Sequence, residues 1–273
     1  MLPDVIFVGP TKCGTTWIDT YLRTREEVVL PSDCKETFFF DKAFDKGVPW
    51  YESHFRGQGG TCVEVAPSLF HKPDALANVR AVCPNARIVI MFRDPFERVV
   101  SHYFHYRKQG VAQMPVAEMA TRHPDMIEAS LFHKYSLMWM EAFPGQVSFV
   151  SYDLLKSDPV GFCSVICDVT GIPDTVPPAD ALAGRAVNAA SLPRSAALAH
   201  VTRRGAELAR RMGGHGLVNW LRKTGLKKLA FSGGGDVSAE RDAVKHDVLG
   251  LTPQLAPDLS AFNATYGKKI KGI

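Results

Sequence analysis

The residues best suited to chemistry lie near the start of the chain, in a loop of small residues. An apolar run, Val5 to Val8, leads into the segment Gly-Pro-Thr-Lys-Cys-Gly-Thr-Thr-Trp at positions 9–17, and a helix is expected to follow. Small residues let backbone N–H groups turn toward an anion, and the positive end of a helix dipole strengthens the attraction. The segment therefore predicts a phosphate cradle, to which the hydroxyls of Thr15 and Thr16 donate further hydrogen bonds.

The position of the lysine distinguishes this loop from that of the nucleoside triphosphatases. In their signature a lysine follows the second glycine, and the next Ser or Thr holds magnesium. Here Gly9 and Gly14 have the same separation, but Lys12 precedes Gly14 and Thr15 occupies the usual lysine position. This order implies that the leaving group differs from the one released by nucleoside triphosphatases. It argues against a P-loop kinase-like phosphotransferase, which nevertheless stays open as an alternative.

A second phosphate-binding motif is expected where the apolar run Arg87 to Phe92 ends. The next residue, Arg93, would lie at the carboxyl edge of a parallel sheet, where α/β proteins bind ligands. A guanidinium there can hold a phosphate through two hydrogen bonds. Ser101 lies about two turns into the next helix and faces the same pocket if that helix packs along the cleft. Alternatively, Arg93 pairs with Asp94 and Ser101 is a surface residue.

The two motifs resemble those of the sulfotransferases that use 3'-phosphoadenosine 5'-phosphosulfate (PAPS). In that family the first loop holds the 5'-phosphosulfate, and the arginine and serine of the second motif hold the 3'-phosphate. The resemblance implies these cofactor-binding residues: Lys12, Cys13, Gly14, Thr15, Thr16, Trp17, Arg93 and Ser101. It also implies that Lys12 offsets charge on the leaving oxygen, that 3'-phosphoadenosine 5'-phosphate (PAP) is the product, and that no metal is required.

The acceptor hydroxyl loses a proton as it attacks, so the reaction needs a base. The cytosolic steroid and phenol sulfotransferases use a histidine, and His102 and His105 lie nearest a recognised motif. The stretch Lys-Glu-Thr-Phe-Phe-Phe-Asp at positions 35–41 instead resembles the heparan sulfate and related bacterial sulfotransferases, whose base is a glutamate just before an aromatic pair. Glu36 is therefore the expected catalytic base. The alternative, a solvated carboxylate paired with Lys35, stays open, as does a non-catalytic module that binds PAP.

The likeness covers roughly Val5 to Pro173 and then becomes thinner. Val-Glu-Val-Ala-Pro-Ser at positions 63–68 resembles the family's strand that ends in Glu-x-x-Pro and borders the acceptor cleft. Arg-Ala-Val-Asn at positions 185–188 is similar to an element of the tyrosylprotein sulfotransferases that places a basic side chain near the cofactor. Arg185 is therefore a further expected cofactor contact.

The C-terminal part contains a strongly basic stretch. Between Arg194 and Lys228 there are nine Lys and Arg residues and one acidic residue, Glu207. Three roles remain open for this stretch. It forms a solvated face, a lid that attracts an anionic acceptor, or a peripheral contact with a membrane that carries a lipid acceptor. The expected partner is a hydroxyl-bearing glycan, lipid or small metabolite, and no nucleic acid. The sequence predicts no oligomeric state.

The elements that must position these residues follow from the hydrophobic pattern. Four apolar runs are expected to be strands: Val5 to Val8, Thr61 to Val65, Arg87 to Phe92 and Val147 to Ser151. Five amphipathic stretches are expected to be helices: Thr15 to Arg23, Ala75 to Val82, Phe96 to Lys108, Ser130 to Ala142 and Pro159 to Thr170. The predicted fold class is therefore α/β, with three α/β/α layers, a central parallel sheet, and a strand–phosphate loop–helix motif like that of P-loop nucleotide-binding proteins.

One domain is expected over residues 1–273, with a core over about 1–175 and a basic helical C-terminal extension over about 184–273. A hydrophobic content of 46% excludes a disordered chain, and a net charge of +4 is too small to indicate a nucleic-acid binder.

The six cysteines are scattered, with no zinc or disulfide spacing. The N-terminus does not resemble a signal peptide, and no apolar run reaches the roughly 20 residues of a membrane span. The expected location is the cytoplasm.

Overall fold

The computed structural model describes residues 1–57, 59–109, 111, 113–177 and 238–272. The chain divides into two compact units. The first consists of Met1–Pro95, Glu128–Val187 and Gln254–Ile273, and the second of Phe96–Ile127 and Asn188–Pro253. Arg185 and the basic stretch 194–228 lie outside the described residues. Their predicted roles, and the prediction of a single domain, stay predictions.

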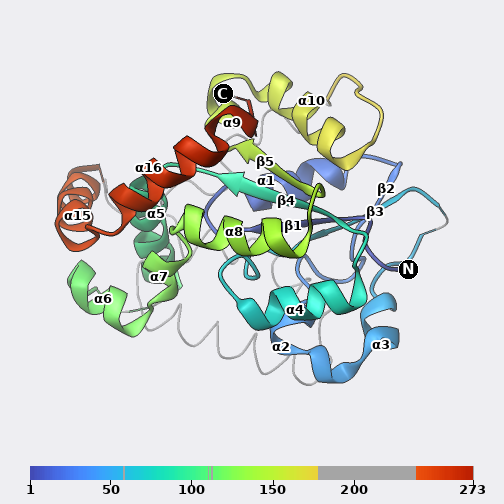
Figure 1. Cartoon of the computed structure of the whole chain (residues 1–273), viewed down its shortest axis with the longest axis horizontal. Helices are drawn as coiled ribbons and strands as arrows, with labels where there is room; N and C mark the ends of the chain where they lie inside the picture. Colours follow the sequence, from blue (N-terminus) through green and yellow to red (C-terminus); the bar gives the residue numbers. More distant parts are fainter. Residues whose placement is uncertain (58, 110, 112, 178–237, 273) are drawn as a thin grey trace, which may run out of the picture. The chain divides into compact units, whose positions relative to one another are not determined.

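A parallel sheet forms the centre of the first unit. In the described residues it has six strands in the order β2-β3-β1-β4-β5-β6, and every neighbouring pair is parallel (Figure 1). The strands are β1 (Val5–Gly9), β2 (Val28–Val29), β3 (Thr61–Val65), β4 (Arg87–Phe92), β5 (Val147–Ser151) and β6 (Ile270–Lys271). The central strands are almost wholly buried, which explains their continuous apolar runs. The four predicted strands are confirmed, with β1 one residue longer than predicted.

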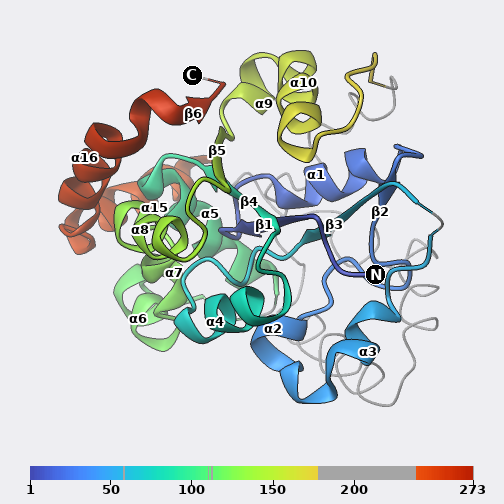
Figure 2. The same cartoon turned by 45° about the vertical axis from the view of Figure 1, so that its right-hand side comes forward.

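Helices cover both faces of this sheet. Those of the first unit are α1 (Thr15–Leu22), α2 (Phe39–Lys42), α3 (Val48–Glu52), α4 (Pro73–Val82), α8 (Phe132–Ala142), α9 (Leu154–Ser157), α10 (Pro159–Thr170) and α16 (Leu255–Tyr266), with 3₁₀ turns η1 (Phe44–Lys46) and η3 (Gly267–Lys269). Helices α1 and α10 lie on one face of the sheet, and α4 and α8 lie on the other (Figures 1 and 2). The predicted α/β fold with three layers is confirmed.

Local signals explain where α10 begins and ends. The Asp158 carboxylate accepts a hydrogen bond from the Gly161 N–H at 3.0 Å, and Pro159 occupies the first turn. At the other end Gly171 adopts a left-handed φ of 67°, a conformation that costs glycine little. The helix therefore has the bounds that the sequence predicts.

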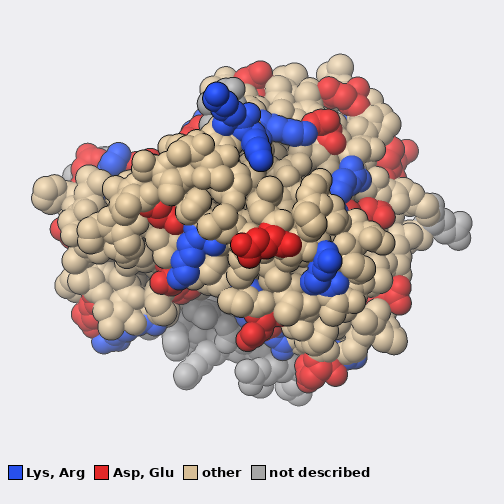
Figure 3. Space-filling model, viewed as in Figure 1, with Lys and Arg blue, Asp and Glu red and all other residues tan. Residues whose placement is uncertain are grey.

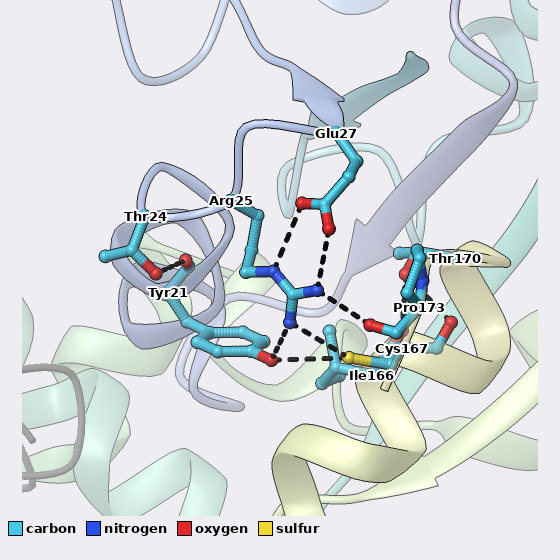
Figure 4. A network of polar contacts seen from close by, with 8 residues as sticks. All are labelled: Tyr21, Thr24, Arg25, Glu27, Ile166, Cys167, Thr170 and Pro173. Atoms are coloured by element: carbon cyan, nitrogen blue, oxygen red, sulfur yellow. Dashed lines mark hydrogen bonds and ion pairs between the residues drawn. The ribbon is translucent and has the colours of Figure 1, made fainter. Parts of the chain in front are cut away.

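A buried polar network joins the end of α1 to the end of α10 (Figure 4). The Arg25 guanidinium donates to the Tyr21 hydroxyl at 3.0 Å and to the Pro173 carbonyl at 2.7 Å, and it pairs with Glu27 at 3.2 Å. The Tyr21 hydroxyl also lies 3.3 Å from the Cys167 sulfur. Burial raises the pKa of the Tyr21 phenol above its usual value. The network holds α1 in place on the sheet, and the loop that precedes α1 is the predicted phosphate cradle.

The C-terminal residues complete the first unit. Strand β6 pairs with β5, and the Phe262 ring of α16 stacks on Phe92 of β4, with centroids 4.8 Å apart. The sequence analysis did not predict β6, because a strand of two residues has no recognisable pattern.

The second unit is helical in its described part, which contains most of α5 (Pro95–Lys108), α6 (Val116–Arg122), α15 (Ser238–Leu251) and the beginning of α7 (Asp125–Glu128). Glu97 of α5 pairs with Arg241 at 2.6 Å and with Lys245 at 2.8 Å, both on α15. These ion pairs join the two longest helices of the described chain.

Acidic and basic side chains are mixed on the face of the molecule drawn in Figure 3. On the face drawn in Figure 3, Lys and Arg lie among Asp and Glu, as expected for a net charge of +4. None of the described helices combines the length and the apolar character that crossing a membrane requires.

Candidate active site

The loop between β1 and α1 has the geometry of an anion cradle. Gly14 precedes the helix with a φ of 83° and, as glycine, has no side chain to cap the first turn of α1. The Trp17 N–H donates to the Gly14 carbonyl at 2.9 Å, so the N–H groups of Thr15 and Thr16 are the candidates for binding an external anion. A Cβ at Gly14 would lie only 2.8 Å from Cδ2 of Tyr152, so the position has no room for a side chain.

The structure brings Lys12 and Arg93 together. Lys12 has a left-handed backbone with a φ of 79°, which is uncommon for a residue other than glycine. Its carbonyl accepts a hydrogen bond from Nη1 of Arg93 at 2.8 Å. Because β1 and β4 are neighbours, the two predicted phosphate motifs meet at the carboxyl edge of the sheet.

Tyr152 is a site residue that the sequence analysis did not single out. It follows β5 directly, and its N–H donates to the Phe92 carbonyl at 2.7 Å. Cζ of Arg93 lies 4.8 Å from the centroid of its ring, which is a cation–π contact. Tyr152 thus packs against both Gly14 and Arg93. An aromatic residue immediately after a predicted strand is the signal that could have identified it.

The segment after β3 lies beside the cradle. The Thr11 hydroxyl donates to the Pro67 carbonyl at 3.3 Å, and a Cβ at Gly9 would lie 2.6 Å from the same oxygen. The Glu-x-x-Pro segment, which the sequence analysis associated with the acceptor, therefore borders the phosphate loop.

Glu36 lies between β2 and α2, and its side chain is 19% exposed. Its carboxylate pairs with Nζ of Lys35 at 2.8 Å. The next residue, Thr37, is hydrogen-bonded to the buried Glu64 of β3. The ion pair considered as an alternative is therefore present, and the role of Glu36 as base stays a prediction.

The other predicted cofactor residues differ in their surroundings. Cys13 and Thr15 are buried, and Thr16 is half-buried. The Trp17 ring is buried between Tyr21 and Phe162, with both pairs of centroids 5.4 Å apart. Trp17 thus packs α1 against α10, and its contact with a cofactor stays a prediction.

Ser101 and the two histidines lie on α5, in the second unit. The contact of Ser101 with a phosphate stays a prediction. His102 is buried, with Nδ1 3.2 Å from Nη2 of Arg98, and Nε2 of His105 lies 2.6 Å from Nε2 of Gln109. His102 thus contacts a residue of its own helix and lies 3.7 Å from the Asp125 carboxylate of α7, whereas His105 contacts the residue just after α5.

One group of metal-ligating side chains occurs among the described residues, and the sequence analysis did not find it. Atoms of Asp33, Cys34 and His54 lie within 4.8 Å of one another. Nδ1 of His54 lies 2.8 Å from the Asp33 carboxylate, and burial raises the pKa of the Cys34 thiol to about 12. The Asp33–His54 contact joins the loop after β2 to the end of α3.

The matches to known proteins each cover only part of the chain. A model of the sulfotransferase domain family matches residues 2–184. Mouse heparan sulfate glucosamine 3-O-sulfotransferase 3A1 is 28% identical over 183 residues, which cover 63% of this chain and 46% of that protein. The membrane-associated sulfotransferase kil1 of Dictyostelium discoideum is 30% identical over 129 residues, which cover 45% of this chain and 27% of that protein. The chain thus spans less than half the length of these curated relatives.

A solved structure supports the fold. The crystal structure of a sulfotransferase from Alicyclobacillus acidocaldarius superposes with a TM-score of 0.56 at 21% identity, and the match covers 68% of this chain and 94% of that chain. At this level of identity the likeness concerns the fold alone.

Proposed function

Since the chain belongs to the sulfotransferase domain family, we propose that it transfers the sulfuryl group of PAPS to a hydroxyl of an acceptor and releases PAP. The observation that carries the proposal is the 2.8 Å hydrogen bond between Nη1 of Arg93 and the Lys12 carbonyl. It brings the two predicted phosphate-binding motifs to one edge of the sheet, an arrangement that suits a nucleotide with two separate phosphate groups.

The cradle supports binding of the donor. In this proposal the first turn of α1 receives the 5'-phosphosulfate and Arg93 receives the 3'-phosphate, while the contact of Ser101 with that phosphate stays a prediction. When bound, PAPS supplies a sulfuryl group whose leaving oxygen belongs to a phosphate. The Lys12 ammonium offsets the negative charge that develops on that oxygen.

Glu36 takes the proton of the attacking hydroxyl in this proposal. Lys35 holds the carboxylate by its charge at 2.8 Å, and Glu36 leaves this partner as it turns to the acceptor. A glutamate carboxyl is ionised at neutral pH in water, so it accepts a proton without prior activation.

A pocket between α2 and the start of α4 supports a glycan acceptor. Its volume is about 430 Å³, and Phe40, Phe44 and Lys72 are among the residues that line it. Asp41, also in the lining, pairs with Lys72 through one oxygen at 2.6 Å, while its buried Oδ1 has no partner among the described residues. The exposed Phe44 ring and the charged groups of the lining suit a sugar that presents hydroxyl groups. The relatives named for heparan sulfate glucosamine support the same class.

The donor site is tested by titration calorimetry with PAP and with adenosine monophosphate. PAP should bind more tightly, because only PAP has the 3'-phosphate. Arg93→Ala should reduce this preference by roughly 10- to 100-fold, since a hydrogen-bonded charge contributes about 1.5–3 kcal/mol. Arg93→Lys, which keeps the charge without the planar fork, is the matched control. Equal affinities for the two nucleotides in the wild type would contradict the proposed site.

The acceptor side is tested with Glu36→Gln in the same protein preparation. Sulfate transfer to a panel of glycan, lipid and small-molecule acceptors should fall by about 10²- to 10⁴-fold while PAP affinity is unchanged. Full activity in the variant would return the role of base to a histidine.

Two results with the wild-type protein would favour the alternative functions. Magnesium-dependent ATP binding would favour the kinase alternative, and PAP binding without transfer to any acceptor would favour a non-catalytic module.

A further inference from the structure

Glu64 is a carboxyl group with no solvent exposure, placed on β3 among the apolar residues of the sheet. We infer that Glu64 is a positioning residue, which acts through Thr37 to hold the segment that carries Glu36. The inference rests on the proposed function for the role of Glu36. It concerns a side chain with no solvent exposure.

The hydrogen bonds of Glu64 converge from separate parts of the chain. Oε1 accepts from the Thr37 hydroxyl at 2.5 Å and from the Thr37 N–H at 3.4 Å. Oε2 accepts from the Tyr51 hydroxyl of α3. The Thr37 hydroxyl in turn accepts from the N–H of Phe39, the first residue of α2, at 3.2 Å. A single carboxyl therefore connects the Glu36 loop, α2 and α3 to the central sheet.

The chemistry of a carboxyl explains why it occupies a site that an apolar side chain would fill at lower cost. Burying a polar group is unfavourable unless hydrogen bonds replace its water. A carboxyl has two oxygens with about four acceptor positions, so it can receive several donors at once. Burial raises the pKa of Glu64, and the charge of nearby Glu36 raises it further. The hydrogen bonds from Thr37 and Tyr51 are thus what stabilises Glu64 at this position.

The short helices on either side need such an anchor. Helix α2 has four residues and α3 has five, and isolated helices of this length are unstable in water. Stacking of Phe39 on Tyr51, with centroids 4.4 Å apart, supplies an apolar contact, but stacked rings do not fix the position of this segment relative to the sheet. The two hydrogen bonds from Thr37 to Glu64 fix that position.

The link to Glu36 is direct. Thr37 follows Glu36, so fixing the N–H and hydroxyl of Thr37 leaves Glu36 with little freedom beyond its own side-chain torsions. A base must lie within hydrogen-bond reach of the proton it accepts. A displacement of about 1 Å can reduce the rate by roughly 100-fold. Loss of the Thr37–Glu64 contact should therefore lower kcat.

The experiment uses variants of the full chain. Thr37→Val removes the hydroxyl at nearly constant volume, Thr37→Ser keeps it, and Glu64→Gln keeps the shape of the carboxyl. Tyr51→Phe is the matched structural control, because it removes the other donor to Glu64 and leaves Thr37 untouched. The readouts are amide hydrogen exchange over residues 35–42, kcat, KM for PAPS, and unfolding free energy.

Thr37→Val and Glu64→Gln should lower kcat by roughly 10- to 100-fold with KM for PAPS unchanged. They should also speed exchange over residues 35–42 but not in β4. Thr37→Ser should restore both properties. Tyr51→Phe should lose comparable unfolding free energy with a smaller loss of kcat.

Two results would overturn the inference. One is a Thr37→Val variant that loses stability but keeps the wild-type kcat. The other is unchanged exchange over residues 35–42 in both Thr37→Val and Glu64→Gln. If the wild-type chain transfers no sulfate from PAPS, the proposed function fails separately, and hydrogen exchange alone then decides whether Glu64 holds the segment.

Discussion

Gly14 combines two constraints that a single methyl group would violate. Its φ of 83° lies in the left-handed region, and a Cβ would approach Tyr152 to 2.8 Å. Tyr152 cannot simply move away, because its ring packs on Arg93 and its N–H is bonded to Phe92. A side chain at Gly14 would therefore clash with a residue that packs against both predicted phosphate motifs.

We expect Gly14→Ala to cost about 1–2 kcal/mol of unfolding free energy from backbone strain alone and to weaken PAP binding by at least roughly tenfold. Gly145→Ala is the matched control, because Gly145 also has a positive φ, 77°, but its Cβ would meet nothing within 4 Å. Urea unfolding and titration calorimetry measure the two effects. The same PAP affinity in Gly14→Ala and in wild type would show that the loop does not depend on close contact with Tyr152.

Individual helices and strands show which local signals in the sequence were sufficient to predict an element and its ends. Helix α10 was predicted to the residue because its Asp cap, Pro and Gly all lie within a few positions of its ends. The helices α2 and α3 were not predicted, because four or five residues contain too little periodicity. Their positions depend instead on distant partners such as Glu64, which no local pattern specifies.

The contact between α1 and α10 yields a prediction about stability. Tyr21→Phe leaves a buried Arg25 N–H without its phenol partner, so the unfolding free energy should fall by about 1–3 kcal/mol. Thr20→Val on the same helix removes an exposed hydrogen bond to the Thr16 carbonyl and should cost less than about 0.5 kcal/mol. Equal costs in urea unfolding would mean that the network in Figure 4 contributes little.

The first unit as a whole includes residues from both ends of the chain. The family match ends at residue 184, yet α16 and β6 complete the sheet and its apolar cover. Phe262 has no solvent exposure and contacts rings of β4, β5 and α8. A core that was expected to end near residue 175 thus also uses the last residues of the chain.

Phe262→Ala should therefore destabilise the first unit by about 3–5 kcal/mol, the usual cost of deleting a buried ring. Val160→Ala, at a residue that is 51% exposed, should change the unfolding free energy by less than about 0.5 kcal/mol. Thermal and urea unfolding test the pair. A cost below about 1 kcal/mol for Phe262→Ala would mean that the C-terminal residues are dispensable for the core.

The sequence by itself determined the α/β class, the strand–loop–helix motif around Lys12 and Gly14, and the position of Arg93 at a strand end. Each depends on residues that are close together in the chain, where hydrophobic period and turn chemistry act directly. The base role of Glu36, the contacts of Ser101 and Arg185, and a cytoplasmic location stay predictions.

Only the tertiary structure decided that Arg93 donates a hydrogen bond to the Lys12 carbonyl, 81 positions away, that Arg93 packs on the ring of Tyr152, and that Glu64 accepts a hydrogen bond from Thr37. These contacts depend on which strands become neighbours, and strand order follows from the packing of the whole sheet and its crossover helices. A local pattern can place a residue at the end of a strand. Its partner depends on which strand lies next to it.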